Sequence, residues 1–274
     1  MADTRIYDGV AADNDISTAT NWSDDTAPIT GDTAIFPAMV HAATTDIDGS
    51  DFSAVLLAEL AVESGCGVNF GSRGAYLEVD TDAFSFAGSG QVFLNIENCG
   101  GEIRIANAAS ASTTNSFGFN LIGASNTGTL IINPGSSGSI GIAPGVEETA
   151  AFTTIMVMAG SVTIGDALTC TTLTMMGGTV KNGSDVTTVN VFGGTYTQTA
   201  NNPTTLNIKG GRVYYNSADI PTTTNLYAGT LDMSGDGRAK VFTTINWYGG
   251  NIYDPGNVLS GTTINWMLGG TRSA

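Results

Sequence analysis

The chain has 274 residues, of which 25 are acidic and 9 are basic, and its formal net charge is −16. An acidic chain repels phosphate groups, which disfavours direct binding to nucleic acid and to anionic membranes. Hydrophobic residues make up 42% of the chain and charged residues 12%, a balance that excludes disorder driven by charge. The 36 glycines, together with abundant Thr, Asn, Ser and Val, are typical of strands and tight turns rather than helices.

Residues 1–50 differ in character from the rest of the chain. The opening MADTRIYDGVAADND has neither the basic nor the apolar region of an export signal, and no run approaches the ~18 apolar residues of a membrane span. The stretch NWSDDTAPITGDTAIFP, which begins at Asn21, contains Trp22 and two prolines. We interpret residues 1–50 as a cap that covers the first edge of the following structure, or alternatively as an attachment arm.

From residue 51 onward, short alternating apolar segments are separated by turn residues. Examples are LAVESGCGVNF from Leu60, FLNIENCGGEIRI from Phe93 and GTLIINPGSSGSIGI from Gly128. No break in composition marks a second compact domain. We therefore place one repeat domain over residues 51–274.

The repeat becomes regular in the C-terminal half. Its pattern is Thr-Thr, apolar, polar, apolar, variable, Gly-Gly, any residue, apolar. The copies are TTIMVMAGSV from Thr153, TTLTMMGGTV from Thr171, TTVNVFGGTY from Thr187, TTLNIKGGRV from Thr204, TTTNLYAGTL from Thr222, TTINWYGGNI from Thr243 and TTINWMLGGT from Thr262. Alternation on both sides of the Gly pair predicts two short strands per copy. The Gly pair suits a sharp corner between them, where a positive φ or a close backbone approach is needed. Such coils of ~17 to 20 residues predict an all-β, single-stranded parallel β-helix, or β-solenoid.

Alternation also separates the two faces of the repeated strand, because Leu206 and Ile208 share one face and Thr205 and Asn207 the other. We expect the apolar face to be interior, although an inverted assignment stays open. The outward columns are then Thr172, Thr188, Thr205, Thr223, Thr244, Thr263; Thr174, Asn190, Asn207, Asn225, Asn246, Asn265; and Met176, Phe192, Lys209, Tyr227, Tyr248, Met267. Stacked Thr and Asn can hydrogen-bond along such ladders.

The third column is unusually apolar for a solvated face. A continuous apolar column of this length is typical of a contact surface. We expect its side chains to form the subunit interface of a homotrimer. The residues concerned are Met176, Phe192, Tyr227, Tyr248 and Met267.

The sequence shows no arrangement of nucleophile, base and metal ligands. His41 is the only histidine, which excludes a His-based triad or a His cluster around a metal. The three cysteines, Cys66, Cys99 and Cys170, form no CxxC pair, so we expect buried apolar residues rather than a disulfide framework or a zinc site. The stretch DIDGSD from Asp46 lacks the full calcium-binding loop.

Paired carboxylates of a glycosidase are the remaining catalytic option. Glu147 and Glu148 are adjacent and would point to opposite sides of a strand, whereas Glu97 and Glu102 lie on either side of a Gly corner. Most Asp residues of the C-terminal half sit among turn residues, where Asp commonly caps its own backbone. We therefore predict a protein that is not an enzyme, with no catalytic residue, cofactor or metal.

The tract from Thr204 to Gly250, TTLNIKGGRVYYNSADIPTTTNLYAGTLDMSGDGRAKVFTTINWYGG, resembles the repeats of β-helical autotransporter passengers and, more closely, β-helical virion proteins of tailed phages. NWSDDTAPITGDTAIF looks like the entry segment before such helices. The phage resemblance implies a capsid decoration or cement protein on the phage head. It would be assembled in the host cytoplasm, and its partners would be itself and the major capsid protein.

Two other functions stay open. One is a phage tailspike that binds a receptor or cleaves polysaccharide, although the regular repeats of residues 153–274 have no Glu to supply its carboxylates. The other is a bacterial surface adhesin or a fragment of an autotransporter passenger, which would need an export signal.

Overall fold

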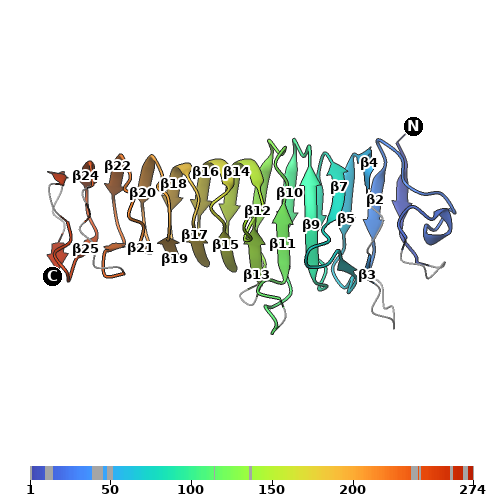
Figure 1. Ribbon diagram of the computed structural model, residues 1–274, viewed down its shortest axis with the longest axis horizontal. Coiled ribbons are helices and arrows are strands. Elements are labelled where there is room, and N and C mark those ends of the chain that lie inside the picture. Colours follow the sequence, from blue (N-terminus) through green and yellow to red (C-terminus); the bar gives the residue numbers. More distant parts are fainter. Residues whose placement is uncertain are drawn as a thin grey trace.

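The computed structural model describes residues 2–9, 15–38, 46–47, 52–113, 115–135, 138–235, 240, 242–259, 262–267 and 271–273. These residues form an all-β parallel solenoid with coils of about 19 residues, which confirms the predicted fold class. Figure 1 shows the strands stacked side by side along the long axis, with the two termini at opposite ends. The molecule is therefore an elongated rod.

Two parallel sheets run along the rod, and each described coil from β2 onward contributes to both. The first, 13-stranded sheet contains β1 (Thr4–Ile6), β2 (Thr33–Phe36), β5 (Glu59–Val62), β8 (Phe84–Phe86), β10 (Glu102–Ile105), β12 (Thr129–Ile132), β14 (Ala150–Val157), β16 (Leu168–Met175), β18 (Val186–Val191), β20 (Thr205–Ile208), β22 (Thr223–Leu226), β24 (Thr244–Trp247) and β26 (Thr263–Trp266).

The second, 14-stranded sheet contains β3 (Asp46–Ile47), β4 (Phe52–Leu57), β6 (Asn69–Phe70), β7 (Leu77–Thr81), β9 (Val92–Glu97), β11 (Phe119–Ile122), β13 (Ser139–Ile142), β15 (Ser161–Ile164), β17 (Thr179–Asn182), β19 (Thr195–Gln198), β21 (Arg212–Tyr215), β23 (Thr230–Asp232), β25 (Asn251–Tyr253) and β27 (Thr271–Ser273). One short 3-10 helix, η1 (Ala19–Asn21), precedes β2.

The predicted faces of the repeated strand are confirmed by burial. In β20, Leu206 and Ile208 are fully buried, whereas Thr205 and Asn207 are half-buried on the outer face. The predicted register holds too, since Thr205 pairs with Thr188 on one side and with Thr223 on the other. Like residues stack because each strand lies beside its counterpart one coil away, at ~4.8 Å. Thr224, fully buried in the interior column, is a polar exception.

The Gly pairs form the corners between the two sheets, as predicted. At Gly194 and Gly211 the backbone φ angles are 77° and 70°, in the left-handed region that favours glycine. A Cβ on Gly211 would lie 2.5 Å from the carbonyl oxygen of Gly194 in the previous coil. These corners therefore need glycine both for conformation and for space.

The paired strands begin earlier than the repeat pattern predicts. β1 pairs with β2, and β2 pairs with β5, so residues 4–6 and 33–36 already belong to the first sheet. The predicted start of the stack near residue 50 is therefore wrong. Between these strands, Trp22 is buried and its indole N–H donates to the Ile16 carbonyl at 2.9 Å. The capping role of residues 1–50 stays a prediction.

Candidate functional site

An apolar stripe runs along the C-terminal half of the rod, at the position directly after the last residue of strands β14, β16, β18, β20, β22, β24 and β26 of the first sheet. It consists of Met158, Met176, Phe192, Lys209, Tyr227, Tyr248 and Met267. Exposed fractions are 44% for Met176, 41% for Phe192, 44% for Tyr227 and 53% for Met267, and Tyr248 is half-buried. All five residues predicted for the subunit interface thus lie on the outer surface. Whether they contact another subunit stays a prediction.

The stripe also includes Met158, which is 40% exposed and was not predicted. Met158 occupies the same place in the copy TTIMVMAGSV as Met176 does in the next copy. The repeat pattern was therefore sufficient to predict Met158 as part of the stripe. Trp266, 58% exposed, belongs instead to the interior column, where its ring stacks on Trp247 at 4.4 Å.

Backbone pairing fixes the alignment of the stripe. The backbone N–H of Phe192 donates to the Met175 carbonyl at 2.8 Å, and that of Tyr227 donates to Ile208 at 2.8 Å. The Tyr227 and Tyr248 rings stack with centroids 4.6 Å apart and planes 9° apart. The rings are thus preorganised by the coil repeat.

Lys209 interrupts the apolar character of the stripe. Its Nζ lies 4.5 Å from the centroid of the Phe192 ring. At this distance the ammonium group interacts with the face of the Phe192 ring. The charged residue is thus joined to its aromatic neighbour in the stripe.

Beside the stripe, the asparagine column forms the predicted hydrogen-bonded ladder. Each side-chain amide donates to the amide oxygen of the preceding coil. The distances are 3.0 Å from Asn207 to Asn190, and 2.8 Å from Asn225 to Asn207, from Asn246 to Asn225 and from Asn265 to Asn246. The ladder thus uses its polar groups for structure.

Glu147 and Glu148 lie in a turn and not in a strand, so their predicted placement on opposite sides of a strand is wrong. The backbone of Glu147 has a φ of 72°, and its side chain is exposed. The Glu148 carboxylate accepts hydrogen bonds from the Tyr76 hydroxyl at 2.8 Å and from the backbone N–H of Gly145 at 2.7 Å. Only Glu148 therefore takes part in a side-chain cluster.

The other carboxylate pair is engaged in local structure. Glu97 accepts hydrogen bonds from the backbone N–H groups of Ala124 at 3.1 Å and Ser125 at 2.9 Å. Glu102 forms an exposed ion pair with Arg104. Both side chains thus have structural partners, and the prediction that the protein is not an enzyme is left untested.

The predicted capping role of Asp in the C-terminal half is confirmed at two turns. Asp254 accepts a hydrogen bond from the backbone N–H of Val258 at 2.8 Å, and Asp232 accepts one from Ser234 at 2.8 Å. Asp232 also pairs with Arg212. Burial alone would raise the pKa of Asp232, but the hydrogen bonds from Ser234 and the Arg212 guanidinium hold it below the ordinary value of 3.8.

The three cysteines are buried and free, as predicted. Burial raises the pKa of each thiol, to about 11 at Cys170, so none is an activated nucleophile. His41 lies outside the described residues, as does most of the stretch that begins at Asp46. Within the described residues, no three His, Cys, Asp or Glu side chains are grouped as a metal site, and no helix has the length and apolar character to cross a membrane.

Comparisons with protein-family models, with curated proteins and with solved structures find no match to this chain. The outer surface of the rod is of two kinds. It presents long regular surfaces, of which the apolar stripe is one, and it carries irregular loops where coils differ in length.

Proposed function

We propose that this protein is a non-enzymatic structural protein of a phage virion. In this proposal it is a capsid decoration or cement protein that stabilises contacts between capsid subunits as a homotrimer. The observation that supports it best is the apolar stripe on a rigid rod. The resemblance of the repeats to phage virion β-helices supports the position on a virion.

Self-association follows from the cost of leaving the stripe in water. Contiguous exposed apolar surface on a soluble protein is typical of a contact site, because burying it is favourable by ~25 cal/mol per Å². Copies of one chain with parallel long axes can bring the same stripe to a common axis in a closed, cyclic arrangement. The stacked Tyr227 and Tyr248 rings would then lie at the centre of the interface.

The acidic half is the part proposed to face the capsid. Residues 1–152 hold 19 acidic and 3 basic side chains, whereas residues 153–274 hold six of each kind. A concentrated negative field steers association toward a basic protein surface. In this proposal the N-terminal half binds the capsid and the C-terminal half binds the other subunits.

The test of self-association is the mass of the full chain in solution, measured by sedimentation equilibrium. We expect a trimer, and we expect the double variant Tyr227→Asp, Tyr248→Asp to be a monomer with an unchanged circular dichroism spectrum. The matched control is Thr179→Asp with Thr195→Asp on the outer face of the second sheet, which should stay trimeric. A monomeric parent protein, or a trimer that tolerates the Tyr variants, contradicts the proposal.

The test of the virion role uses phage capsids that lack this protein. We expect the purified protein to co-sediment with them and to raise the temperature at which they rupture. Raised salt should weaken this binding, because the acidic half is screened. Failure to bind, or a position at the tail tip in micrographs of labelled virions, contradicts the proposal.

A further inference from the structure

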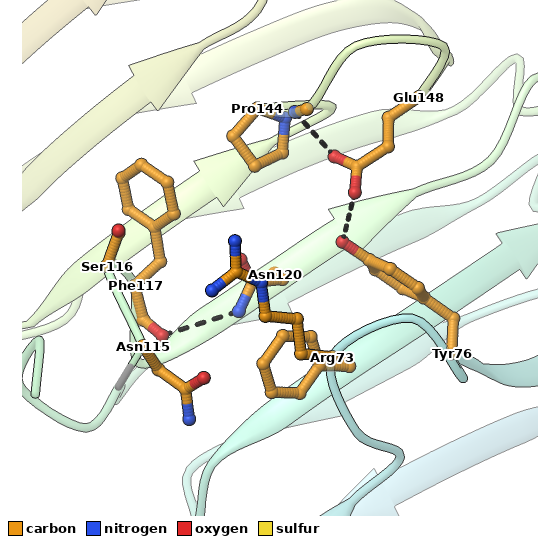
Figure 2. A pocket seen from close by; sticks show the side chains of 10 residues that line it. Arg73, Tyr76, Asn115, Ser116, Phe117, Asn120, Pro144 and Glu148 are labelled. Carbon is orange, nitrogen blue, oxygen red and sulfur yellow. Dashed lines mark hydrogen bonds between the residues drawn. The ribbon is translucent and has the colours of Figure 1, made fainter. Parts of the chain in front are cut away.

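A cavity of about 170 Å³ lies on the outer side of the second sheet in the N-terminal half. Figure 2 shows the side chains around it, with Tyr76 and Glu148 on one side, Phe117 on the other, and Arg73 and Asn120 between them. The cavity is smaller than the roughly 300–1,000 Å³ pockets that take drug-sized ligands. It has room for one small ring or one side chain.

Loops before β7, before β11 and after β13 build this cavity over strands β9 and β11, and glycines allow them to approach closely. A Cβ on Gly141 would lie 2.7 Å from the Phe117 ring, and a Cβ on Gly145 would lie 2.7 Å from the Glu148 carboxyl carbon. The Phe117 ring and the Glu148 carboxylate thus occupy the space that a side chain at Gly141 or Gly145 would need. Close packing of this kind holds the cavity walls in a defined shape.

The Glu148 carboxylate is held at one wall. The Tyr76 hydroxyl donates to one of its oxygens at 2.8 Å, and the backbone N–H of Gly145 donates to the other at 2.7 Å. Burial and the neighbouring carboxylate raise the pKa of Tyr76, so its hydroxyl stays a donor. A carboxylate offers about four acceptor positions, which leaves Glu148 able to accept further hydrogen bonds.

Arg73 supplies donors at the same cavity. It is one of three basic residues in the acidic half; the other two are paired, Arg5 with three aspartates and Arg104 with Glu102. In the described part of the chain, no carboxylate forms an ion pair with Arg73. Its guanidinium therefore offers a fork of N–H groups at the cavity.

Asn120 adds a buried amide to the cavity. The side chain is 5% exposed, and its Nδ2 donates to the carbonyls of Val92 and Phe117, both at 3.3 Å. No described group donates to its Oδ1, which leaves a fixed acceptor. Beside it, the half-exposed Phe117 ring supplies an apolar face.

We propose that this cavity binds one neutral sugar ring of a glycan. Guanidinium donors alternate with carboxylate and amide acceptors, and a sugar hydroxyl both donates and accepts. The aromatic ring suits the apolar C–H face of a pyranose. The Arg73 guanidinium and the Glu148 carboxylate place one charge of each sign at the cavity, and the surrounding acidic half then disfavours a negatively charged ligand, so the sugar is neutral. Glycan binding would add to the proposed structural function and does not depend on trimer formation.

The test is ligand-observed saturation-transfer NMR and calorimetry on the full chain. The probes are the methyl glycosides of glucose, galactose, mannose and N-acetylglucosamine, with methyl glucuronide as the charged comparison. We expect at least one neutral glycoside to bind more tightly than the glucuronide. Arg73→Ala and Phe117→Ala should each weaken that binding by about tenfold or more, because each removes a main contact.

Matched controls separate the cavity from general effects on the protein. Arg104→Ala and Phe192→Ala, which change an exposed Arg and an exposed aromatic residue elsewhere, should leave binding unchanged. Because Phe117→Ala could loosen the loops, Phe117→Tyr keeps the ring and should retain binding, and thermal unfolding of each variant reports folding. Absence of binding by every neutral glycoside, preference for the glucuronide, or equal losses in the controls would overturn the proposal.

Discussion

The two halves of the rod share one fold but differ in how their residues are used. From β14 onward, the coils of the first sheet repeat the same residue types at the same positions, and stacking produces the asparagine ladder and the apolar stripe. Before β14, coils differ in length and loop shape, and the loops build the cavity around Glu148. Regular repeats thus produce extended surfaces, and departures from the repeat produce an individual site.

The cores of the two halves also differ in regularity. In the C-terminal half, aliphatic residues stack in columns, such as Leu173, Val189 and Leu206. In the N-terminal half, buried rings contact one another in many orientations; they include Tyr7, Trp22, Phe36, Phe52, Phe70, Phe86 and Phe119. Aromatic rings fill the irregular cross-section that unequal coils leave, because they carry large volume in few rotamers.

The largest expected effect tests the aromatic core. Phe36 is fully buried and contacts the rings of Tyr7, Trp22 and Phe70. Phe36→Ala should lower the free energy of unfolding by about 4 kcal/mol, because it leaves a cavity among rings that cannot close it. Hydrogen exchange should quicken in the N-terminal half and stay unchanged near β20, since coils contact only their neighbours. Uniform loss of protection along the rod would contradict this separation.

The next effect tests the corners of the regular half. Gly211→Ala should destabilise the protein by about 3 kcal/mol, because the residue has a φ of 70° and its Cβ would lie 2.5 Å from the Gly194 carbonyl. Gly31→Ala is the matched control: its φ is 92°, but its Cβ would have nothing within 4 Å. It should cost only about 1 kcal/mol. Equal losses in urea unfolding would show that space at the corner is unimportant.

A third prediction concerns two buried carboxylates, one in each half, that form ion pairs with arginine. Asp32 pairs with Arg5 in the N-terminal half, and Asp232 pairs with Arg212 in the C-terminal half. Burial raises the pKa of Asp32, but hydrogen bonds from the Asp3 backbone and Arg5 outweigh it and hold the pKa below the ordinary 3.8. Because the folded pKa is depressed, the stabilisation is present above pH 3.8 and is lost as the pH falls further.

Acid unfolding measures this contribution. Asp32→Asn should be less stable than the parent protein at pH 7, and the difference should shrink as the pH falls below about 4. Asp232→Asn should behave alike in the C-terminal half. A difference in unfolding free energy that stays constant between pH 7 and pH 3 would show that neither carboxylate titrates with folding.

The smallest expected effect concerns the asparagine ladder. Asn225 donates to Asn207 and accepts from Asn246, both at 2.8 Å and half-buried. Asn225→Ala should lower the free energy of unfolding by about 1 kcal/mol. The loss is small because the same amide groups form hydrogen bonds with water in the unfolded chain. Asn265→Ala, which removes one ladder bond in the last described coil, should cost less. Chemical denaturation of the two variants distinguishes these losses, and a larger loss for Asn265 would contradict the ladder.

The repeat made most of the C-terminal half predictable. Period-two alternation placed Leu206 inside and Asn207 outside, and the Gly pairs marked the corners, because both depend on residues close together in the sequence. The same logic placed Met176 and Tyr227 on the outer surface. It did not show the early start of the first sheet, since β1 and β2 pair across a segment that lacks the repeat.

The sequence by itself determined the architecture and the composition of the stacked columns, because a fixed period brings like residues together in every coil. Only the tertiary structure decided the cavity. Tyr76 and Glu148 are 72 residues apart in the chain, yet their side chains meet at 2.8 Å. Their meeting depends on how coils of unequal length stack and where each loop leaves the sheet, and no local pattern specifies either.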